Sequence, residues 1–190
     1  MVLRPERFTE QAQQVLSNSQ GILRRYKHSQ WDVEHILLAL LELEQGLPGM
    51  IFAELGISTD VVKERMHRML EDAPKVTYDN TQIYATPRAA GLLDNAKRES
   101  ERLSDEFIGA EHLLIAATIE TQGDSAQVLK ENGIDQEKIY RALMAARGSH
   151  RVDDPRAESR YRALEKYSID LTKLAREGKL DPVVGRDDSI

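Results

Sequence analysis

The sequence predicts an all-α fold made of two tandem four-helix repeats that pack with pseudo-twofold symmetry. The stretch WDVEHILL at residues 31–38 recurs as IGAEHLLI at residues 108–115, and the same offset of 77 residues holds without a gap from Thr9 to Ile57. Apolar residues recur at the spacing of amphipathic helices in both halves. Because an internal repeat marks one supersecondary unit used twice, residues 1–146 are expected to form one domain with a shared core.

Four helices are expected in the first repeat. Thr9 is predicted to cap the first helix and Asp32 the second, whose residues 36–41 are apolar nearly all round. A helix of that kind is buried, so the second helix is expected at the centre of the core. A short third helix is predicted between Gly46 and Gly56, and a fourth follows it. The apolar face expected on the fourth helix comprises Val61, Val62, Met66, Met69 and Leu70.

The second repeat restarts after residues 73–85, where Pro74 and several β-favouring residues predict an extended connection. Thr86 followed by Pro87 predicts a helix N-terminus, because proline is favoured at the first helical position. The remaining helices are expected to begin at Ala110, Ser125 and Asp135. Each repeat therefore has one apolar central helix that the other repeat is expected to cover.

The composition changes after Ala146. Residues 147–160 are polar and predict a mobile linker, of which Asp153 and Asp154 are interpreted as solvated residues. One more helix and an extended tail are expected within residues 161–190.

Composition and charge argue against several classes of protein. A net charge of −6 and only 5% aromatic residues disfavour nucleic-acid binding. The absence of cysteine excludes a disulfide framework and a thiolate metal site. No stretch approaches 18 apolar residues and the first residues lack a secretory pattern, so a cytoplasmic protein with no membrane partner is expected.

Motifs typical of an active site are missing from the sequence. Glu34-His35 and Glu111-His112 are adjacent pairs, whereas a helical zinc site needs two histidines four residues apart. There is no G-x-S-x-G nucleophile motif and no phosphate-binding loop. The chain is therefore expected to be non-enzymatic and to hold no metal.

The two Glu-His pairs fall in the first turns of the central helices. Glu34 and Glu111 are expected to face solvent beside free backbone N–H groups, where a carboxylate either complements the helix dipole or binds a cation next to an anion. His35 and His112 are expected to be structural and to bond to the backbone of the neighbouring repeat. A structural role is also assigned to Thr9, Leu37, Thr86 and Leu114.

The first repeat contains the motifs F-T-x-x-A, E-H-[IL]-L-x-A-L and L-G-I, which here read Phe8–Ala12, Glu34–Leu40 and Leu55–Ile57, and the pattern repeats about 75 residues later behind T-P-R-A at Thr86–Ala89. Over residues 5–146 the chain resembles the double-repeat N-terminal domain of the Clp AAA+ unfoldases, of the ClpC and ClpB type. Residues 163–186 are similar to the entry of the first ATPase module in that family, which would make residues 161–190 the start of that module.

This resemblance implies a binding domain carried on a hexameric ATPase ring. Such a domain receives unfolded or aggregated polypeptides, or adaptor proteins, before the ring threads them. The resemblance places ATP and Mg²⁺ in ATPase modules beyond residue 190, so no cofactor is expected in this chain. The fragment alone is expected to be a monomer.

Two alternatives to a substrate-delivering domain remain open. The resemblance to ClpC-type domains implies a site for phosphorylated arginine at the start of each central helix. Glu34 and Glu111 match the acidic positions of that site. Val33 adjoins the first site, and Gly109 and Ala110 adjoin the second, but neither repeat has the threonine of the family pattern. Asp32 would also repel a phosphate at the first site, which favours the second. The other alternative is a free-standing adaptor or regulator with the same fold and no ATPase partner.

Overall fold

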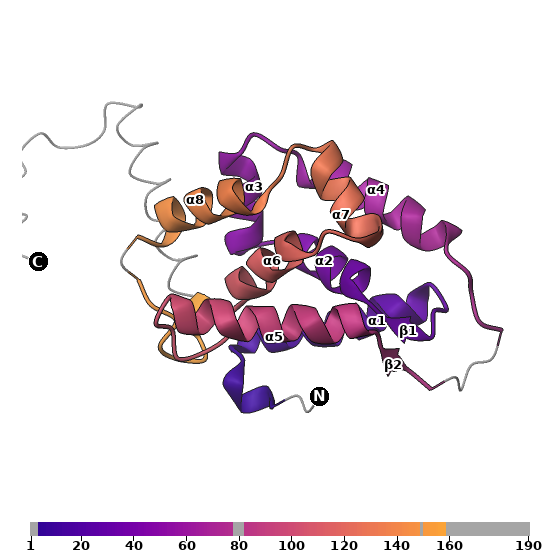
Figure 1. Cartoon of the computed structure of the whole chain (residues 1–190), viewed down its shortest axis with the longest axis horizontal. Coiled ribbons are helices and arrows are strands. Elements are labelled where there is room, and N and C mark those ends of the chain that lie inside the picture. Colours follow the sequence, from indigo (N-terminus) through magenta and orange to yellow (C-terminus); the bar gives the residue numbers. More distant parts are fainter. Residues whose placement is uncertain (1–3, 78–81, 149, 159–190) are drawn as a thin grey trace, which may run out of the picture.

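The computed structural model describes residues 4–77, 82–148 and 150–158, so the helix and tail expected within residues 161–190 lie outside the described residues. Helices dominate, as the sequence predicts (Figure 1). The elements are η1 (Pro5–Arg7), α1 (Glu10–Arg25), β1 (Gln30–Trp31), α2 (Val33–Leu41), α3 (Leu47–Glu54), α4 (Thr59–Asp72), β2 (Tyr84–Ala85), α5 (Pro87–Arg102), α6 (Ala110–Ile119), α7 (Gly123–Glu131) and α8 (Gln136–Arg147).

Backbone pairing between the two halves reveals the predicted pseudo-twofold. Strand β1 pairs in parallel with β2, and Phe8 forms a parallel bridge with Ile108. The Thr86 N–H donates to the Trp31 carbonyl, and the Thr9 N–H donates to the Ile108 carbonyl, both at 3.0 Å. Donors and acceptors of these two bonds are related by the 77-residue offset. Each repeat therefore holds the other through the same backbone contact.

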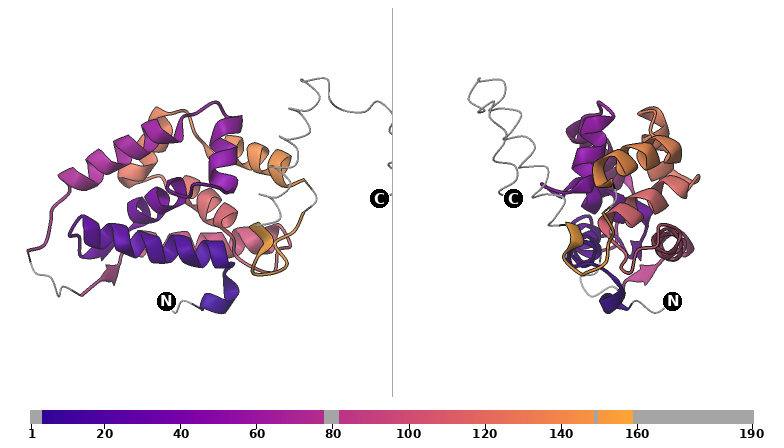
Figure 2. Two further views of the ribbon diagram at one scale, coloured as in Figure 1. Left: turned by 180° about the vertical axis from the view of Figure 1, so that it is seen from behind. Right: turned by 90° about the vertical axis from the view of Figure 1, so that its left-hand side faces the viewer.

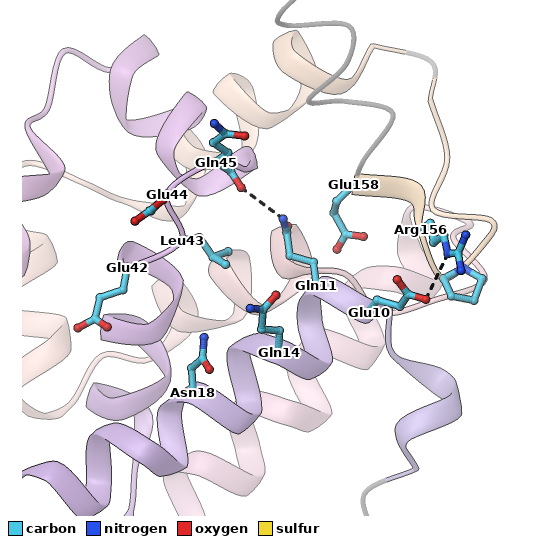
Figure 3. Close-up of a pocket in the computed structure, with 11 residues that line it drawn as sticks. Glu10, Gln11, Gln14, Asn18, Glu42, Leu43, Glu44, Gln45, Arg156 and Glu158 are labelled. Atoms are coloured by element: carbon cyan, nitrogen blue, oxygen red, sulfur yellow. Dashed lines mark hydrogen bonds and ion pairs between the residues drawn. The ribbon is translucent and has the colours of Figure 1, made fainter.

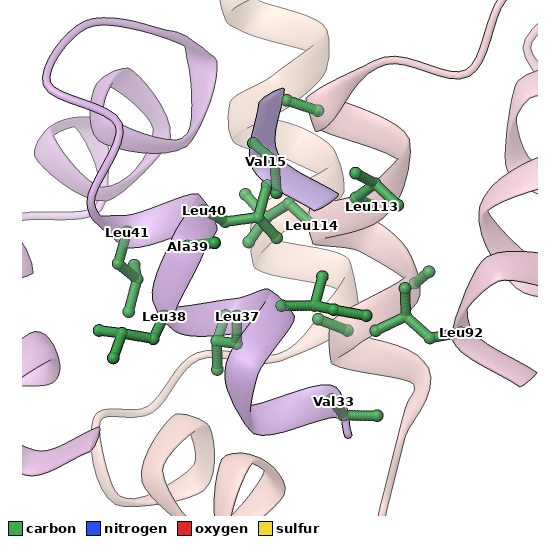
Figure 4. Packing of buried hydrophobic residues seen from close by; sticks show 14 of the residues in the cluster. Val15, Val33, Leu37, Leu38, Ala39, Leu40, Leu41, Leu92, Leu113 and Leu114 are labelled. Atoms are coloured by element: carbon green, nitrogen blue, oxygen red, sulfur yellow. The ribbon is translucent and has the colours of Figure 1, made fainter. Parts of the chain in front are cut away.

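The central helices α2 and α6 lie in the middle of the molecule, between α1 and α5 on one side and α3, α4, α7 and α8 on the other (Figure 1). All nine residues of α2 are buried, and in α6 the buried run extends from Ala110 to Ala117. Leu37 and Leu114 are fully buried in the shared cluster (Figure 4). The apolar stretches that predicted central helices therefore occupy the centre of the core.

Several local expectations are corrected. Val61 is 60% exposed, because the buried stripe of α4 follows the four-residue spacing of Val62, Met66 and Leu70 and Val61 lies outside it. Helix α7 begins at Gly123, two residues before the expected start.

The expected solvated linker is instead packed on the domain where the structure describes it. Residues 150–158, here called the strap, pass the N-terminal end of α1 (Figure 2). Val152 and Ala157 are fully buried, and Glu158 is nearly so. The Val152 carbonyl accepts from two backbone N–H groups before α6, and the Pro155 carbonyl accepts from the Glu10 N–H at 2.8 Å. The division of the chain at residue 146 stays a prediction.

Candidate binding site at the starts of the central helices

In the first repeat, the carboxylate of Asp32, the residue that caps α2, accepts two hydrogen bonds. Asp32 Oδ1 accepts from the Val33 N–H and from the Thr86 hydroxyl, both at 2.8 Å. Arg88 of α5 reaches the same place from the other repeat. Its Nη1 lies 3.2 Å from Asp32 Oδ2 and from Glu34 Oε1, and its Nη2 lies 2.8 Å from Glu34 Oε2. One guanidinium therefore bridges both carboxylates.

This pairing decides the charge of Glu34. Burial alone would raise the pKa of its carboxyl, but hydrogen bonds from Arg88 and from the Ser125 N–H outweigh burial and hold the pKa below its ordinary value. Glu34 is only 8% exposed. The expectation that it faces solvent is therefore wrong, because Arg88 covers it.

In the second repeat the equivalent donors, the Ala110 N–H and the Thr9 hydroxyl, bond to a residue that lies outside the two repeats. Gly109 caps α6 and has no side chain to offer. Glu158 of the strap supplies the carboxylate: its Oε2 accepts from the Ala110 N–H at 3.1 Å and from the Thr9 hydroxyl at 2.5 Å. Ala110 and Thr9 lie 77 residues from Val33 and Thr86 respectively. The carboxylate of Glu158 therefore takes the part that the Asp32 carboxylate has in the first repeat.

Glu111 is fully buried in an ion network with the end of α8, so it does not face solvent as expected either. Arg147 Nη1 lies 2.9 Å from Glu111 Oε2, and two nitrogens of the same guanidinium contact Asp105 at 2.7 and 2.8 Å. Burial, aided by the charge of Glu158, raises the pKa of Glu111 to about 8. Arg147 opposes this shift, but its single charge is shared with Asp105.

Asp105 remains a strong acid within this network. Burial would raise the pKa of its carboxyl, but hydrogen bonds from His112, Arg147 and the Val152 N–H outweigh burial and lower it. The one positive charge therefore sits with an ionised Asp105, and Glu111 has no full counter-charge of its own.

Both histidines bond within their own repeat, not to the neighbouring one as expected. His35 Nδ1 accepts from the Asp32 N–H at 3.0 Å, and His112 makes the equivalent bond at 2.8 Å. The Nε2 atoms face His28 Nδ1 and Asp105 Oδ2 respectively. Burial lowers the pKa of both rings, that of His35 to about 4. Each ring is therefore neutral, with its proton on Nε2, and its Nδ1 satisfies the backbone N–H of the residue that caps the helix.

Acidification is expected to destabilise the fold through His35. The pKa of the ring is about 4 in the folded chain against 6.5 ordinarily, so protonation favours the unfolded state. The contribution of His35 is present above pH 6.5 and is lost as the pH falls towards 4. Urea unfolding at a series of pH values measures this slope. His35→Gln is expected to show a shallower slope in that window, and an unchanged slope would contradict the assignment.

Sequence reasoning missed Arg88, Arg147, Asp105 and Glu158. Arg88 lies inside the T-P-R-A motif that marked the second repeat, so its position after the helix cap was an available signal. Asp105 stands where the first repeat has His28 and Arg147 where it has Leu70, and departures of that kind between repeats were also visible. For Glu158 the sequence offered no signal.

The described residues show neither a metal-binding cluster nor a membrane-spanning helix. There, no three His, Asp or Glu side chains gather as ligands for a metal ion. Over the same residues, no helix combines the length and the apolarity that crossing a membrane would require. A cavity of about 360 Å³ lies beside the start of α2 and reaches across to Asp124 of the second repeat. Its wall combines His28, Asp32 and Glu34 with Met69 and Leu70 of α4.

Residues 7–132 match the family described as the Clp repeat (R) N-terminal domain. The chain belongs to this family. Two curated relatives of this Clp N-terminal domain are the chaperone protein ClpB 1 of Synechocystis sp., 39% identical over 98% of the chain, and ClpB3, mitochondrial, of Oryza sativa, 38% identical over 98%. These alignments cover 20% and 19% of the relatives, so the chain spans about a fifth of their length.

Solved structures carry the same fold as this Clp domain. The Hsp104 N-terminal domain from Candida albicans matches 80% of the chain and 99% of its own length, with a TM-score of 0.73 at 20% identity. The N-terminal domain of the ClpV1 ATPase from E. coli matches 71% of the chain and 82% of its own, with a TM-score of 0.61 at 20% identity. The all-α double-repeat fold expected from the sequence is confirmed.

Proposed function

We propose that this chain is the substrate- or adaptor-binding N-terminal domain of an ATP-dependent Clp chaperone, and that it delivers unfolded polypeptides to the ATPase ring. The observation that carries this proposal is the family match over residues 7–132, together with curated relatives that are named as ClpB chaperones. ATP and Mg²⁺ would act in ATPase modules outside the chain, which itself has only a binding role. We also propose a cytoplasmic location, although the rice relative is named as mitochondrial.

The surface between the repeats supports this function. The 360 Å³ cavity at that junction offers apolar contacts from Met69 and Leu70 and a polar rim from His28 and Asp124. Such a mixture suits a short extended segment with an apolar side chain, bound weakly enough to be passed on.

Titration with a permanently unfolded protein, reduced and alkylated, is the direct test. Binding with a Kd in the range of about 1 μM to 1 mM is expected. Met69→Glu is expected to weaken it about tenfold, because it places a charge in the apolar wall. Val61→Glu on the same helix, outside that wall, serves as the matched control. No binding up to millimolar concentration would contradict the function.

Reading the gene beyond residue 190 separates an ATPase subunit from a free-standing adaptor. A phosphate-binding loop, G-x-x-x-x-G-K-[ST], is expected there. Its absence would leave the binding role but overturn the link to an ATPase ring.

The phosphoarginine receptor is the second candidate, and the position of both glutamates in the first turns favours it. In each repeat the chain already supplies partners: Arg88 pairs with Glu34, and Glu158 accepts from the Ala110 N–H. A phosphoarginine at the second site would have to displace Glu158. Calorimetric titration with a phosphoarginine peptide, against Glu34→Ala and Glu111→Ala, tests this; unchanged heats in both variants would remove it.

A further inference from the structure

Three buried acceptor atoms have no hydrogen-bond partner among the described residues. They are Gln11 Oε1, Glu111 Oε1 and Glu158 Oε1. Gln11 and Glu158 line one cavity of about 630 Å³ (Figure 3). A methyl carbon placed on Gly109 would lie 3.2 Å from Glu111 Oε1 and 3.1 Å from Glu158 Oε2, so the two carboxylates adjoin each other. Buried acceptors of this kind call for a donor.

The first repeat shows which donor fits this arrangement. There, Arg88 bridges Asp32 and Glu34 and also donates from Nη2 to the Gln122 carbonyl at 2.9 Å. In the second repeat the carboxylates of Glu158 and Glu111 correspond to those of Asp32 and Glu34.

The residue equivalent to Arg88 is Gln11. Its Nε2 approaches the equivalent carbonyl, that of Gln45, at 3.4 Å, but the amide bonds to neither carboxylate. Glutamine is shorter than arginine and carries no charge. The second repeat thus has two carboxylates, those of Glu158 and Glu111, where the first repeat has Asp32 and Glu34. It has no arginine at the position of Arg88 to bridge them.

The cavity beside Gln11 is suited to a cation. Glu10, Glu42, Glu44 and Glu158 line it, and Arg156, the one basic residue among the described residues of its wall, contacts Glu10 at 3.3 Å (Figure 3). A guanidinium has five N–H donors in one plane, enough for three acceptors, and binds carboxylates more strongly than a neutral donor does.

We propose that the second repeat binds an unmodified arginine side chain of a captured polypeptide, whose guanidinium enters beside Gln11 and bridges Glu158 and Glu111 as Arg88 bridges Asp32 and Glu34. The inference rests on the proposed function, since the captured polypeptide supplies the arginine. No phosphate is required, because Glu158 already accepts from the Ala110 N–H, which an anion at this helix start would use.

The charges at the two sites agree with this difference. Glu34, paired with Arg88, has a lowered pKa, whereas the pKa of the buried Glu111 is raised to about 8. The charged groups around Glu111 are Arg147 of α8, Asp105 before α6 and Glu158 of the strap. A guanidinium binds the ionised form, so below pH 8 its binding must release a proton from Glu111. Affinity for arginine is therefore expected to rise as the pH approaches 8.

The variant Gln11→Arg tests the inference without any ligand, because it restores the internal arginine of the first repeat. The pKa of Glu111, followed by carbon NMR of its carboxyl, is expected to fall from about 8 towards the ordinary glutamate value of 4.5. Gln14→Arg is the matched control, since it adds the same charge to the same helix and cavity away from the position equivalent to Arg88. Equal shifts in the two variants, or no shift in either, would overturn the assignment.

The ligand test compares the unfolded protein with a copy whose arginines are converted to citrulline, which keeps the shape but loses the charge. At pH 8 the arginine form is expected to bind the full chain about tenfold more tightly. That advantage should vanish in Gln11→Arg and in Glu111→Gln, with folding of each variant checked by circular dichroism.

The outcomes separate the two proposals. Equal binding of both forms to the wild-type chain would refute the arginine site and leave the proposed function intact. If neither form binds, the proposed function fails, and N-acetyl-arginine amide then decides the site by whether it shifts the Glu111 carboxyl signal. A response to phosphoarginine alone, with Glu158 displaced, would also overturn the inference.

Discussion

Replacing Arg147 by alanine is expected to lower the free energy of unfolding by about 3–5 kcal/mol, as removal of one partner of a buried ion pair does. The Arg147 guanidinium is fully buried and contacts Asp105 and Glu111. Its Nε also donates to the His150 carbonyl at 3.0 Å. Truncation would leave two carboxyl groups inside the core without their cation. Urea unfolding followed through Trp31, the one tryptophan, measures the loss.

Arg141→Ala is the matched control for this experiment, because Arg141 is on the same helix and pairs with Glu137 in solvent. An exposed pair of that kind contributes under about 1 kcal/mol. Similar losses in the two variants would show that the buried network does not stabilise the fold. A loss in Arg147→Ala that shrinks once the pH is low enough to protonate Asp105 would support the electrostatic cause.

Leu114→Ala is expected to cost about 2–5 kcal/mol, since it removes a side chain from the centre of the shared core and leaves a cavity. Leu114 is fully buried in α6, and its equivalent in α2, Leu37, is fully buried as well. The two substitutions should therefore cost similar amounts. Differential scanning calorimetry gives the comparison, with Val61→Ala at an exposed position as control, expected to stay within about 0.5 kcal/mol. A loss at Leu114 no larger than that at Val61 would refute the central position of α6.

The internal repeat explains why so much of the fold was predictable. A buried helix must be apolar on every side, and such a run at residues 36–41 recurs in the second half of the chain. Helix caps are also local in sequence: Thr9 and Thr86 accept from N–H groups three residues ahead, at Ala12 and Ala89. Patterns that local geometry produces are readable from one sequence.

The candidate site was less predictable, because its partners come from distant parts of the chain. Glu34 and Glu111 were found from their place in the first turn, but their burial depends on Arg88 and Arg147, 54 and 36 residues away. Glu158 lies 48 residues from the Ala110 N–H that it caps, in a segment whose polar composition predicted a solvated linker. The polarity of a residue does not tell whether its side chain is hydrated at the surface or hydrogen-bonded to a buried donor.

The strap has a practical consequence for where this domain can be cut. The Pro155 carbonyl and the Glu158 carboxylate satisfy N–H groups at the first residues of α1 and α6. A protein truncated where the second repeat ends would leave the Glu10 and Ala110 N–H groups without these acceptors. It would also lose the Val152 N–H that donates to Asp105. We therefore expect the smallest stably folded unit to be longer than the two repeats, and a fragment for crystallisation or binding work should run through Glu158.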